Sequence, residues 1–170
     1  MRYTVREKFF RVGQDNDIND ENGNPVFRVD GKALSLRNLM IVKDLQGNEV
    51  ARVHRKLASW MPRYEMDLTG SGTAVLQRKL SNPFRPKWSV TVPGQAEMQL
   101  TGNLTGHDFT MQRDGSMVAT VSRKWVSMTA TYGVDVADGQ NDLLALCVVL
   151  ALEAEQQRGR GSGGISFGSS

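Results

Sequence analysis

Three Arg–Lys pairs are the residues of this sequence best suited to hold a ligand, because their cations can bind anions. The pairs are Arg55/Lys56, Arg78/Lys79 and Arg123/Lys124. A basic stretch at 82–88, NPFRPKW, adds Arg85 and Lys87 beside the aromatic residues Phe84 and Trp88. Near an anionic membrane each cation contributes on the order of 1 kcal/mol, and aromatic rings favour the membrane interface. These residues form a candidate site for anionic phospholipid.

Other interpretations of the basic pairs stay open. Neighbouring residues of a strand point to opposite faces, so only one member of each pair can face a given side. Solvated cations at strand ends also oppose aggregation through sheet edges, and that role needs no ligand. Cations beside aromatic rings could also meet phosphates and bases, although nucleic acid is the least favoured of these partners.

The histidines and the single cysteine make no case for catalysis. His54 lies far from His107 in the sequence, and the repeats described below place Gln77 and Ser122 at the position of His54. This interchange predicts an ordinary polar side chain on a strand. Cys147 lies among Leu, Val and Ala, so burial should raise the pKa of its thiol and block access to it.

No Ser-His-Asp arrangement, glycine-rich phosphate loop or zinc-ligand spacing is evident in the sequence. The polar segment 13–23 superficially resembles a calcium loop, but its acidic residues do not have the EF-hand offsets and its flanks are typical of strands. We predict that this segment is a polar loop. We expect no enzymatic activity, no cofactor and no metal site.

The elements that must position the basic pairs are predicted by an internal repeat. Segments 47–57, 70–80 and 115–125 each have Gly, then a β-branched residue and Ala, then Val or Leu, and then Arg-Lys and a large apolar residue. A weaker copy at 23–29 lacks the Arg-Lys ending. A turn glycine before an alternating run is typical of one half of a β-hairpin, so the copies predict a sheet of similar hairpins.

Close turn spacing extends this pattern over most of the chain. We predict strands at 3–12, 25–29, 33–39, 40–44, 50–54, 63–68, 74–77, 88–92, 98–101, 108–113, 118–122 and 127–134. About a dozen antiparallel strands are enough to close into a barrel and remove exposed edges. Trp60 and Tyr64 are expected either in the wall of the core, which we favour, or in an exposed docking patch.

The segment 142–157 is predicted to be a helix buried inside this barrel. Its residues from Leu143 to Leu152 are apolar on every helical face. These ten residues span only about 15 Å, whereas the hydrocarbon core of a bilayer is roughly 30 Å thick. The helix is therefore too short to cross a membrane. Residues 158–170 are rich in Gly and Ser, and we expect a flexible tail.

Length and composition favour one soluble domain over residues 1–157. The chain has 170 residues, of which 39% are hydrophobic and 23% charged, with a formal net charge of +3. A single cysteine suits a reducing compartment, and the N-terminus has no apolar signal segment. We expect a cytoplasmic protein, with peripheral membrane association as the further expectation.

Three segments carry a resemblance to a known family. They are DLQGNEVARVHRK at 44–56, DGSMVATVSRKW at 114–125 and YGVDVADGQNDLLALCVVL at 132–150. The chain resembles the LURP-one-related family of the tubby C-terminal-like superfamily, which also includes the phospholipid scramblases. The resemblance implies a closed antiparallel β-barrel around a buried C-terminal helix. Tubby binds phosphoinositides through basic surface residues, but no residue-by-residue match to that site is found.

Together, these observations predict a non-enzymatic binding or scaffold module. The leading hypothesis is peripheral association with anionic phospholipid through a basic rim. The principal alternative is a protein-interaction module with no lipid role, whose signature would be an exposed apolar patch. Scramblase-like transport would require the helix to leave the barrel and span the bilayer. An enzyme with a ligand pocket inside the barrel is disfavoured because the helix would occupy that space.

Overall fold

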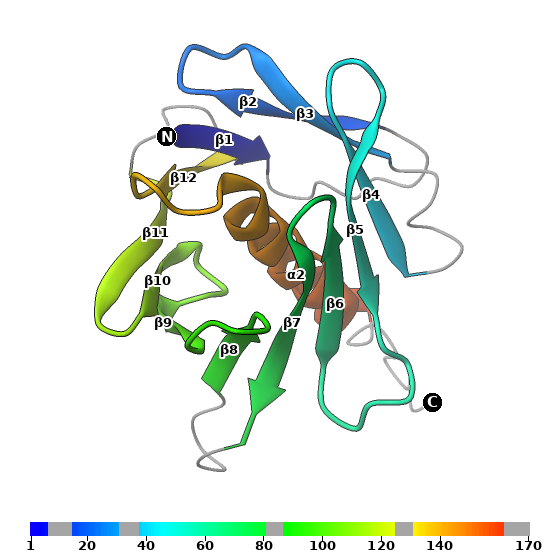
Figure 1. The fold of residues 1–170 in the computed structure, drawn as a ribbon, viewed down its shortest axis with the longest axis vertical. Helices are drawn as coiled ribbons and strands as arrows, with labels where there is room; N and C mark the ends of the chain where they lie inside the picture. Colours follow the sequence, from blue (N-terminus) through cyan, green and yellow to red (C-terminus); the bar gives the residue numbers. More distant parts are fainter. Residues whose placement is uncertain (7–14, 31–37, 81–86, 125–130, 162–170) are drawn as a thin grey trace, which may run out of the picture.

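The computed structural model describes residues 1–6, 15–30, 38–80, 87–124 and 131–161. Twelve strands and one long helix make up this part of the chain (Figure 1). The strands are β1 (Arg2–Arg6), β2 (Asn16–Asp20), β3 (Pro25–Asp30), β4 (Leu39–Lys43), β5 (Glu49–Arg55), β6 (Arg63–Leu68), β7 (Gly72–Lys79), β8 (Lys87–Thr91), β9 (Met98–Asn103), β10 (Asp108–Arg113), β11 (Ser116–Ser122) and β12 (Thr131–Val136). The helix is α2 (Asp142–Gly161).

The strands close into one antiparallel barrel, which confirms the predicted fold. Each strand pairs with its neighbours in the sequence, and β1 closes the ring by pairing with β12. The repeat copies form the second strands of the hairpins β4–β5, β6–β7 and β10–β11, and the weaker copy enters β3. Closure leaves no unpaired edge among the described strands, and this favours a sheet built from short strands.

Helix α2 passes through the middle of the ring and forms the centre of the core (Figure 1). Every side chain from Leu144 to Glu153 is buried. Alternate residues of the strands pack around it, as Tyr64, Met66 and Leu68 do on β6. A helix that is apolar on all sides is stable here because strands surround it. No helix among the described residues is long and apolar enough to cross a membrane.

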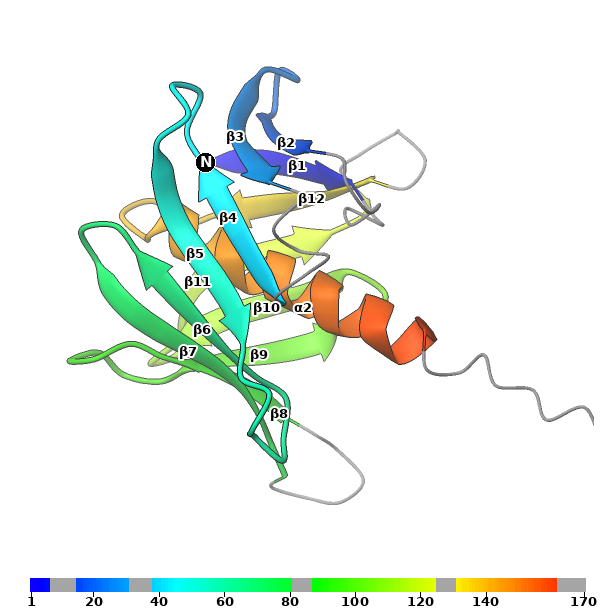
Figure 2. The ribbon, with the colours of Figure 1, turned by 90° about the vertical axis from the view of Figure 1, so that its right-hand side faces the viewer.

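The barrel has two distinct ends. At the helix-start end lie the turn before α2 and the hairpin turns that contain Gly47, Gly70 and Gly115. At the helix-exit end lie the last residues of β5, β7, β9 and β11, and the C-terminal turns of α2 project from this end (Figure 2). The hydrogen bond from Gln156 Nε2 to the carbonyl oxygen of Leu104, 2.9 Å long, joins the departing helix to the barrel.

Two element predictions were wrong. Residues 16–20, predicted as part of a polar loop, form β2, because Ile18 is fully buried and the strand pairs with both β1 and β3. The helix also extends beyond the predicted end at 157 to Gly161. Arg158 and Arg160 lie in its last turn, where cations interact favourably with the helix dipole. Residues 7–12, most of the predicted strand at 33–39, residues 127–130, and Phe84 and Arg85 lie outside the described residues.

Candidate binding surface at the helix-exit end

The structure brings the predicted basic pairs to one end of the barrel. Strands β5, β7 and β11 run in the same direction, so Arg55, Arg78 and Arg123 all lie at the helix-exit end. Lys56, Lys79 and Lys124 follow them in the chain, and Lys87 joins the group because it pairs with Lys79 across β7 and β8. Seven of the predicted cations, six of them from the repeat, thus lie at this end, and Arg85 lies outside the described residues.

Several of these cations are paired with acidic residues that the sequence analysis did not identify. The Nε of Arg55 donates to Oε2 of Glu155 at 3.1 Å, and the hydroxyl of Tyr64 donates to the same oxygen at 2.8 Å. Burial, and then the Glu155 carboxylate, raise the pKa of Tyr64 far above its usual range, so this hydroxyl remains a donor. Arg55 therefore ties the barrel wall to the helix and is largely neutralised.

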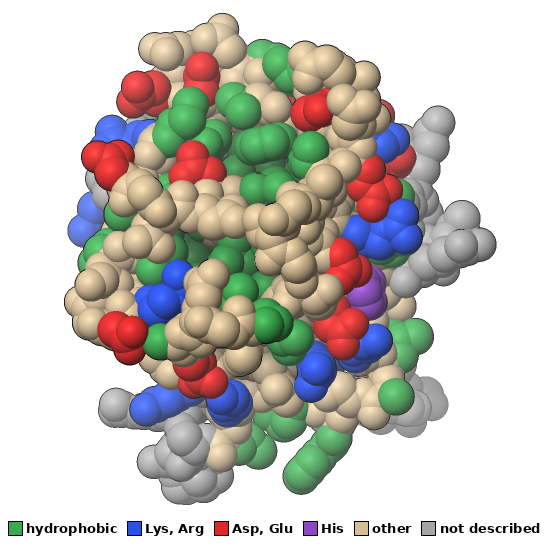
Figure 3. Space-filling view, in the orientation of Figure 1, with side chains coloured by type: hydrophobic (Ala, Val, Ile, Leu, Met, Phe, Trp, Pro, Cys, Tyr) green, Lys and Arg blue, Asp and Glu red, His purple; other side chains and the backbone are tan. Residues whose placement is uncertain are grey.

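The lysines of two pairs are neutralised on the outer surface. Lys56 Nζ lies 3.0 Å from Oε2 of Glu65, and Lys79 Nζ contacts Oε2 of Glu97. Hydrogen bonds from these lysines lower the pKa of both carboxyl groups, so the acids stay charged. In the space-filling view, acidic and basic side chains alternate along the right-hand side of the barrel (Figure 3). This alternation weakens the positive potential of the predicted rim.

One of the remaining cations, Arg78, lines a groove. Arg78, Lys87 and Lys124 form no ion pair within the described part of the chain. Arg78 and Trp88, which face each other across β7 and β8, are half-buried and line a cavity of about 380 Å³ together with Leu104, Leu152 and Gln156. The Nε of Arg78 is buried there without a hydrogen-bond partner in that part of the chain. The groove combines the guanidinium of Arg78 with the apolar side chains of Trp88, Leu104 and Leu152, and Glu155 also lines it.

Exposed apolar side chains lie at the same end. Trp60 is 92% exposed and Leu57 69%, both in the turn between β5 and β6, and Leu80 at the end of β7 is 53% exposed. Hydrophobic side chains project from the lower edge of the barrel in Figure 3. The favoured placement of Trp60 in the core was wrong, because it lies in a turn, whereas Tyr64 occupies an inward position of β6 and is buried as expected.

A buried polar cluster at this end was also missed. His107, which has a positive φ of 53°, is buried, and its Nε2 lies 2.6 Å from Oε2 of Glu153 on the helix. Its ring stacks on Tyr132 with a centroid distance of 4.2 Å. Arg123 places Nη2 3.2 Å from Nδ1 of His107, and its Nε donates to the carbonyl oxygen of Gly106 at 3.1 Å. Arg123 therefore orders the β9–β10 turn instead of standing free at the rim.

Comparison with known proteins agrees with the fold. The sequence model of LURP-one-related proteins matches residues 1–153. The chain belongs to the LURP-one-related family. The uncharacterized protein YxjI of Bacillus subtilis (strain 168) is 23% identical over 149 residues, which cover 88% of this chain and 90% of that protein. The X-ray structure of the Arabidopsis thaliana protein AT5G01750 has a TM-score of 0.62 and 15% sequence identity, and the match covers 91% of each chain. At that identity the likeness shows the fold alone.

Two further residues of this LURP-one-related protein lie as the sequence indicated. His54 is on the outer face of β5, half-buried, with Nε2 3.2 Å from Oε2 of Glu65. Cys147 is fully buried in α2, and burial raises the pKa of its thiol to about 12. Both residues serve the structure of the barrel and lie away from the groove beside Arg78.

Proposed function

We propose that this LURP-one-related protein is a non-enzymatic binding module whose helix-exit end associates peripherally with anionic phospholipid. The observation that carries the proposal is the exposed tip of the β5–β6 hairpin, where Trp60 is 92% and Leu57 69% exposed beside the basic strand ends. Tryptophan favours the level of the lipid headgroups, and cations attract anionic lipid. The two features act on the same surface.

The charge that attracts the membrane comes from the cations that have no acidic partner. An exposed cation already paired with a carboxylate gains little from a second anion. For this reason Arg78, Lys87 and Lys124 are expected to contribute more than Arg55 and Lys79. The exposed tip supplies the apolar contact, and its burial in the membrane stabilises binding by about 25 cal/mol for each Å² of apolar surface removed from water.

Co-sedimentation with vesicles tests the proposal. Vesicles of phosphatidylcholine alone and of phosphatidylcholine with phosphatidylserine are compared at low and high salt. The unaltered protein should sediment only with the anionic vesicles and should be released by salt. Leu57→Ser/Trp60→Ser and Arg78→Ser/Lys87→Ser should each weaken binding by about tenfold, which is about 1.4 kcal/mol.

The matched control is Arg2→Ser/Arg52→Ser, which removes the same charge from β1 and from the barrel wall, where both arginines are ion-paired. It should bind like the unaltered protein. Equal weakening by the control would mean that net charge, and not the helix-exit end, drives binding. Absence of binding to either vesicle would overturn the lipid proposal.

A protein partner is the second candidate function, because the same exposed apolar tip meets the criterion for a protein-interaction module. In that case the unaltered protein should capture a protein partner and should not bind vesicles. Leu57→Ser/Trp60→Ser should abolish the capture. Scramblase-like transport has less support, since the apolar part of α2 is enclosed by strands. A cytoplasmic location accords with a single cysteine that is buried and unpaired.

A further inference from the structure

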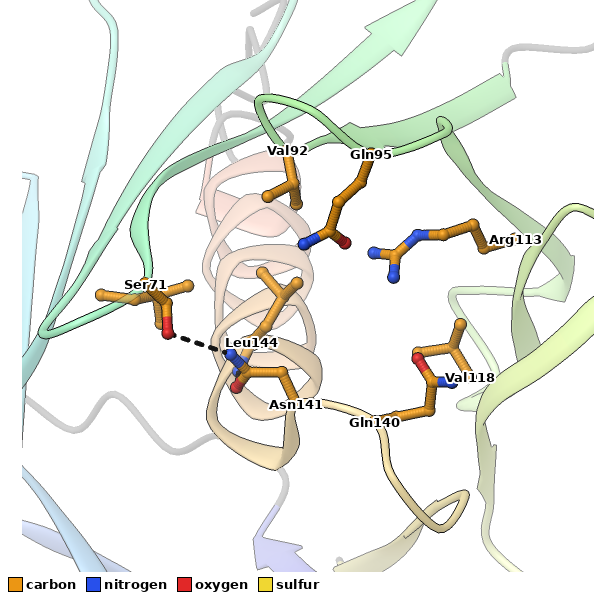
Figure 4. A pocket seen from close by; sticks show the side chains of 9 residues that line it. Ser71, Val92, Gln95, Arg113, Val118, Gln140, Asn141 and Leu144 are labelled. Atoms are coloured by element: carbon orange, nitrogen blue, oxygen red, sulfur yellow. Dashed lines mark hydrogen bonds between the residues drawn. The ribbon is translucent and has the colours of Figure 1, made fainter.

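The helix-start end of the barrel holds a second cavity, far from the proposed membrane surface. Its volume is about 220 Å³. Residues from the β6–β7, β8–β9 and β10–β11 hairpins and from the turn before α2 line it (Figure 4). Drug-sized ligands occupy pockets of roughly 300 to 1,000 Å³, so this cavity fits a smaller molecule.

Arg113 occupies an inward position at this barrel mouth. On β10 the buried residues Phe109 and Met111 alternate with more exposed ones, and Arg113 continues their register. Across the ladder Arg113 pairs with Met98, which is fully buried. Its side chain is half-buried and reaches into the cavity, as Figure 4 shows. A position that the barrel otherwise fills with apolar side chains therefore holds a cation.

Among the described residues, no acidic side chain balances this cation. Arg113 forms no ion pair with them, and its buried Nε has no hydrogen-bond partner in that part of the chain. None of the described residues that line the cavity is Asp or Glu. The carboxylate of Asp142, at the start of α2, instead accepts a hydrogen bond of 2.5 Å from the hydroxyl of Tyr3. A buried Nε without a hydrogen-bond partner costs free energy, and an anion bound in the cavity would supply that partner.

The cavity walls suit a molecule with one charged and one apolar part. Gln95 points its amide group toward Arg113, and the amide of Gln140 lies beside Val118 (Figure 4). Val92, Val118 and Leu144 are buried and form an apolar floor. Asn141 caps the helix by accepting a hydrogen bond from the Leu144 backbone N–H at 3.0 Å. Because Asn141 and Leu144 line the cavity, the start of α2 lies beside it, and the positive end of the helix dipole adds to the field of Arg113.

We infer that this cavity binds a small organic anion, whose carboxylate or phosphate group pairs with Arg113 and whose apolar part lies against Val92, Val118 and Leu144. Guanidinium groups recognise both oxyanions with two parallel hydrogen bonds. The site is at the opposite barrel end from Trp60, so it is independent of the proposed membrane surface.

Nuclear magnetic resonance tests this inference through the Nε–H signal of Arg113, assigned by its loss in Arg113→Gln. Butyrate, inorganic phosphate and the neutral butanamide are titrated at constant ionic strength. Butyrate or phosphate should shift the signal saturably below about 50 mM, whereas butanamide should bind at least about tenfold more weakly. Stronger binding of butyrate would identify a carboxylate ligand, and stronger binding of phosphate a phosphorylated one.

Arg113→Gln should weaken binding of the preferred anion by about tenfold or more, as read from the backbone signal of Leu144. Arg113→Lys keeps the charge without the planar fork and should give an intermediate loss, while Arg52→Gln on the outer wall should change nothing. The inference is overturned if neither anion gives a saturable shift, if butanamide binds as well as butyrate, or if binding survives in Arg113→Gln.

Discussion

The imidazole of His107 and the carboxylate of Glu153 are joined by a hydrogen bond of 2.6 Å between Nε2 and Oε2, inside the helix-exit end of the barrel. The side chains are only 5% and 2% exposed. The pair connects the β9–β10 turn to α2 at the point where the apolar part of the helix ends. Together with the contacts of Glu155 and Gln156, it holds the helix in place in the barrel.

Removing the carboxylate should destabilise the protein strongly. Glu153→Ala leaves the buried Nε2 of His107 without this acceptor, and an unsatisfied buried polar group costs about 2 kcal/mol or more. Urea unfolding measures the loss. Glu49→Ala is the control, since Glu49 forms an exposed ion pair with Arg52 that is worth about 1 kcal/mol or less. Equal costs of the two substitutions would contradict a structural role for the buried pair.

The cysteine should report unfolding of the barrel. Cys147 is fully buried in α2, and burial raises the pKa of its thiol to about 12. An exposed thiol has a pKa of about 8.5, so its reactive thiolate form increases markedly between pH 7 and pH 9, whereas the buried thiol of Cys147 stays protonated in this range. In the native protein, a thiol reagent should label Cys147 at the rate of barrel opening, far below its rate in denaturant. Fast labelling of the native protein would show that α2 leaves the barrel readily.

How much of the fold the sequence predicts depends on how locally each element is determined. Strands 63–68 and 108–113 have the predicted bounds, because period-two alternation is a property of neighbouring residues. Strand β2 could not be found in this way, since its sequence NDIND has one apolar residue and is stabilised by pairing with β1 and β3. The residues of β2 are typical of turns, but pairing with strands on both sides makes this segment a strand.

The candidate site was predictable in its position but not in its charge. The repeat placed Arg55, Arg78 and Arg123 at equivalent strand ends, and antiparallel order brought them to one barrel end. The acid that neutralises Arg55 is Glu155, 100 residues away in the sequence, and no local pattern indicates that contact. The exposure of Trp60 likewise depends on whether the chain near it forms a turn or a strand.

Two turns with the same chemistry should make stability depend on acid pH. In the sequences DENGN at 20–24 and DLQGN at 44–48, the aspartate accepts hydrogen bonds from the backbone two and four residues ahead and from the final Asn side chain. The pKa of Asp20 is lowered chiefly by the backbone N–H of Asn24, and that of Asp44 chiefly by the side chain of Asn48.

Because the folded pKa of each carboxyl lies below its unfolded value, each stabilises the fold above about pH 4 and loses that contribution as the pH falls through the folded pKa. Asp20→Asn/Asp44→Asn should therefore show a shallower loss of stability between about pH 5 and pH 2, measured by urea unfolding. Asp138→Asn removes a carboxylate that has no hydrogen bond or ion pair within the described residues, and should follow the unaltered protein. Identical slopes for all three proteins would refute the role of the turns.

Gly102 lies where β9 passes close to β10. Its φ is 125°, and a Cβ added there would lie 2.7 Å from the carbonyl oxygen of Asp108 and 2.9 Å from Cα of Phe109. Gly102→Ala therefore has to displace backbone beside a core residue, and we expect a loss on the order of 3 kcal/mol. At Gly47, also at positive φ, nothing lies within 4 Å of the added Cβ, so Gly47→Ala should cost only about 1 kcal/mol. Urea unfolding of the two variants separates the cost of positive φ, which both share, from the cost of the steric clash with β10, which only Gly102→Ala has. Equal losses of unfolding free energy would mean that β9 and β10 move apart at no energetic cost.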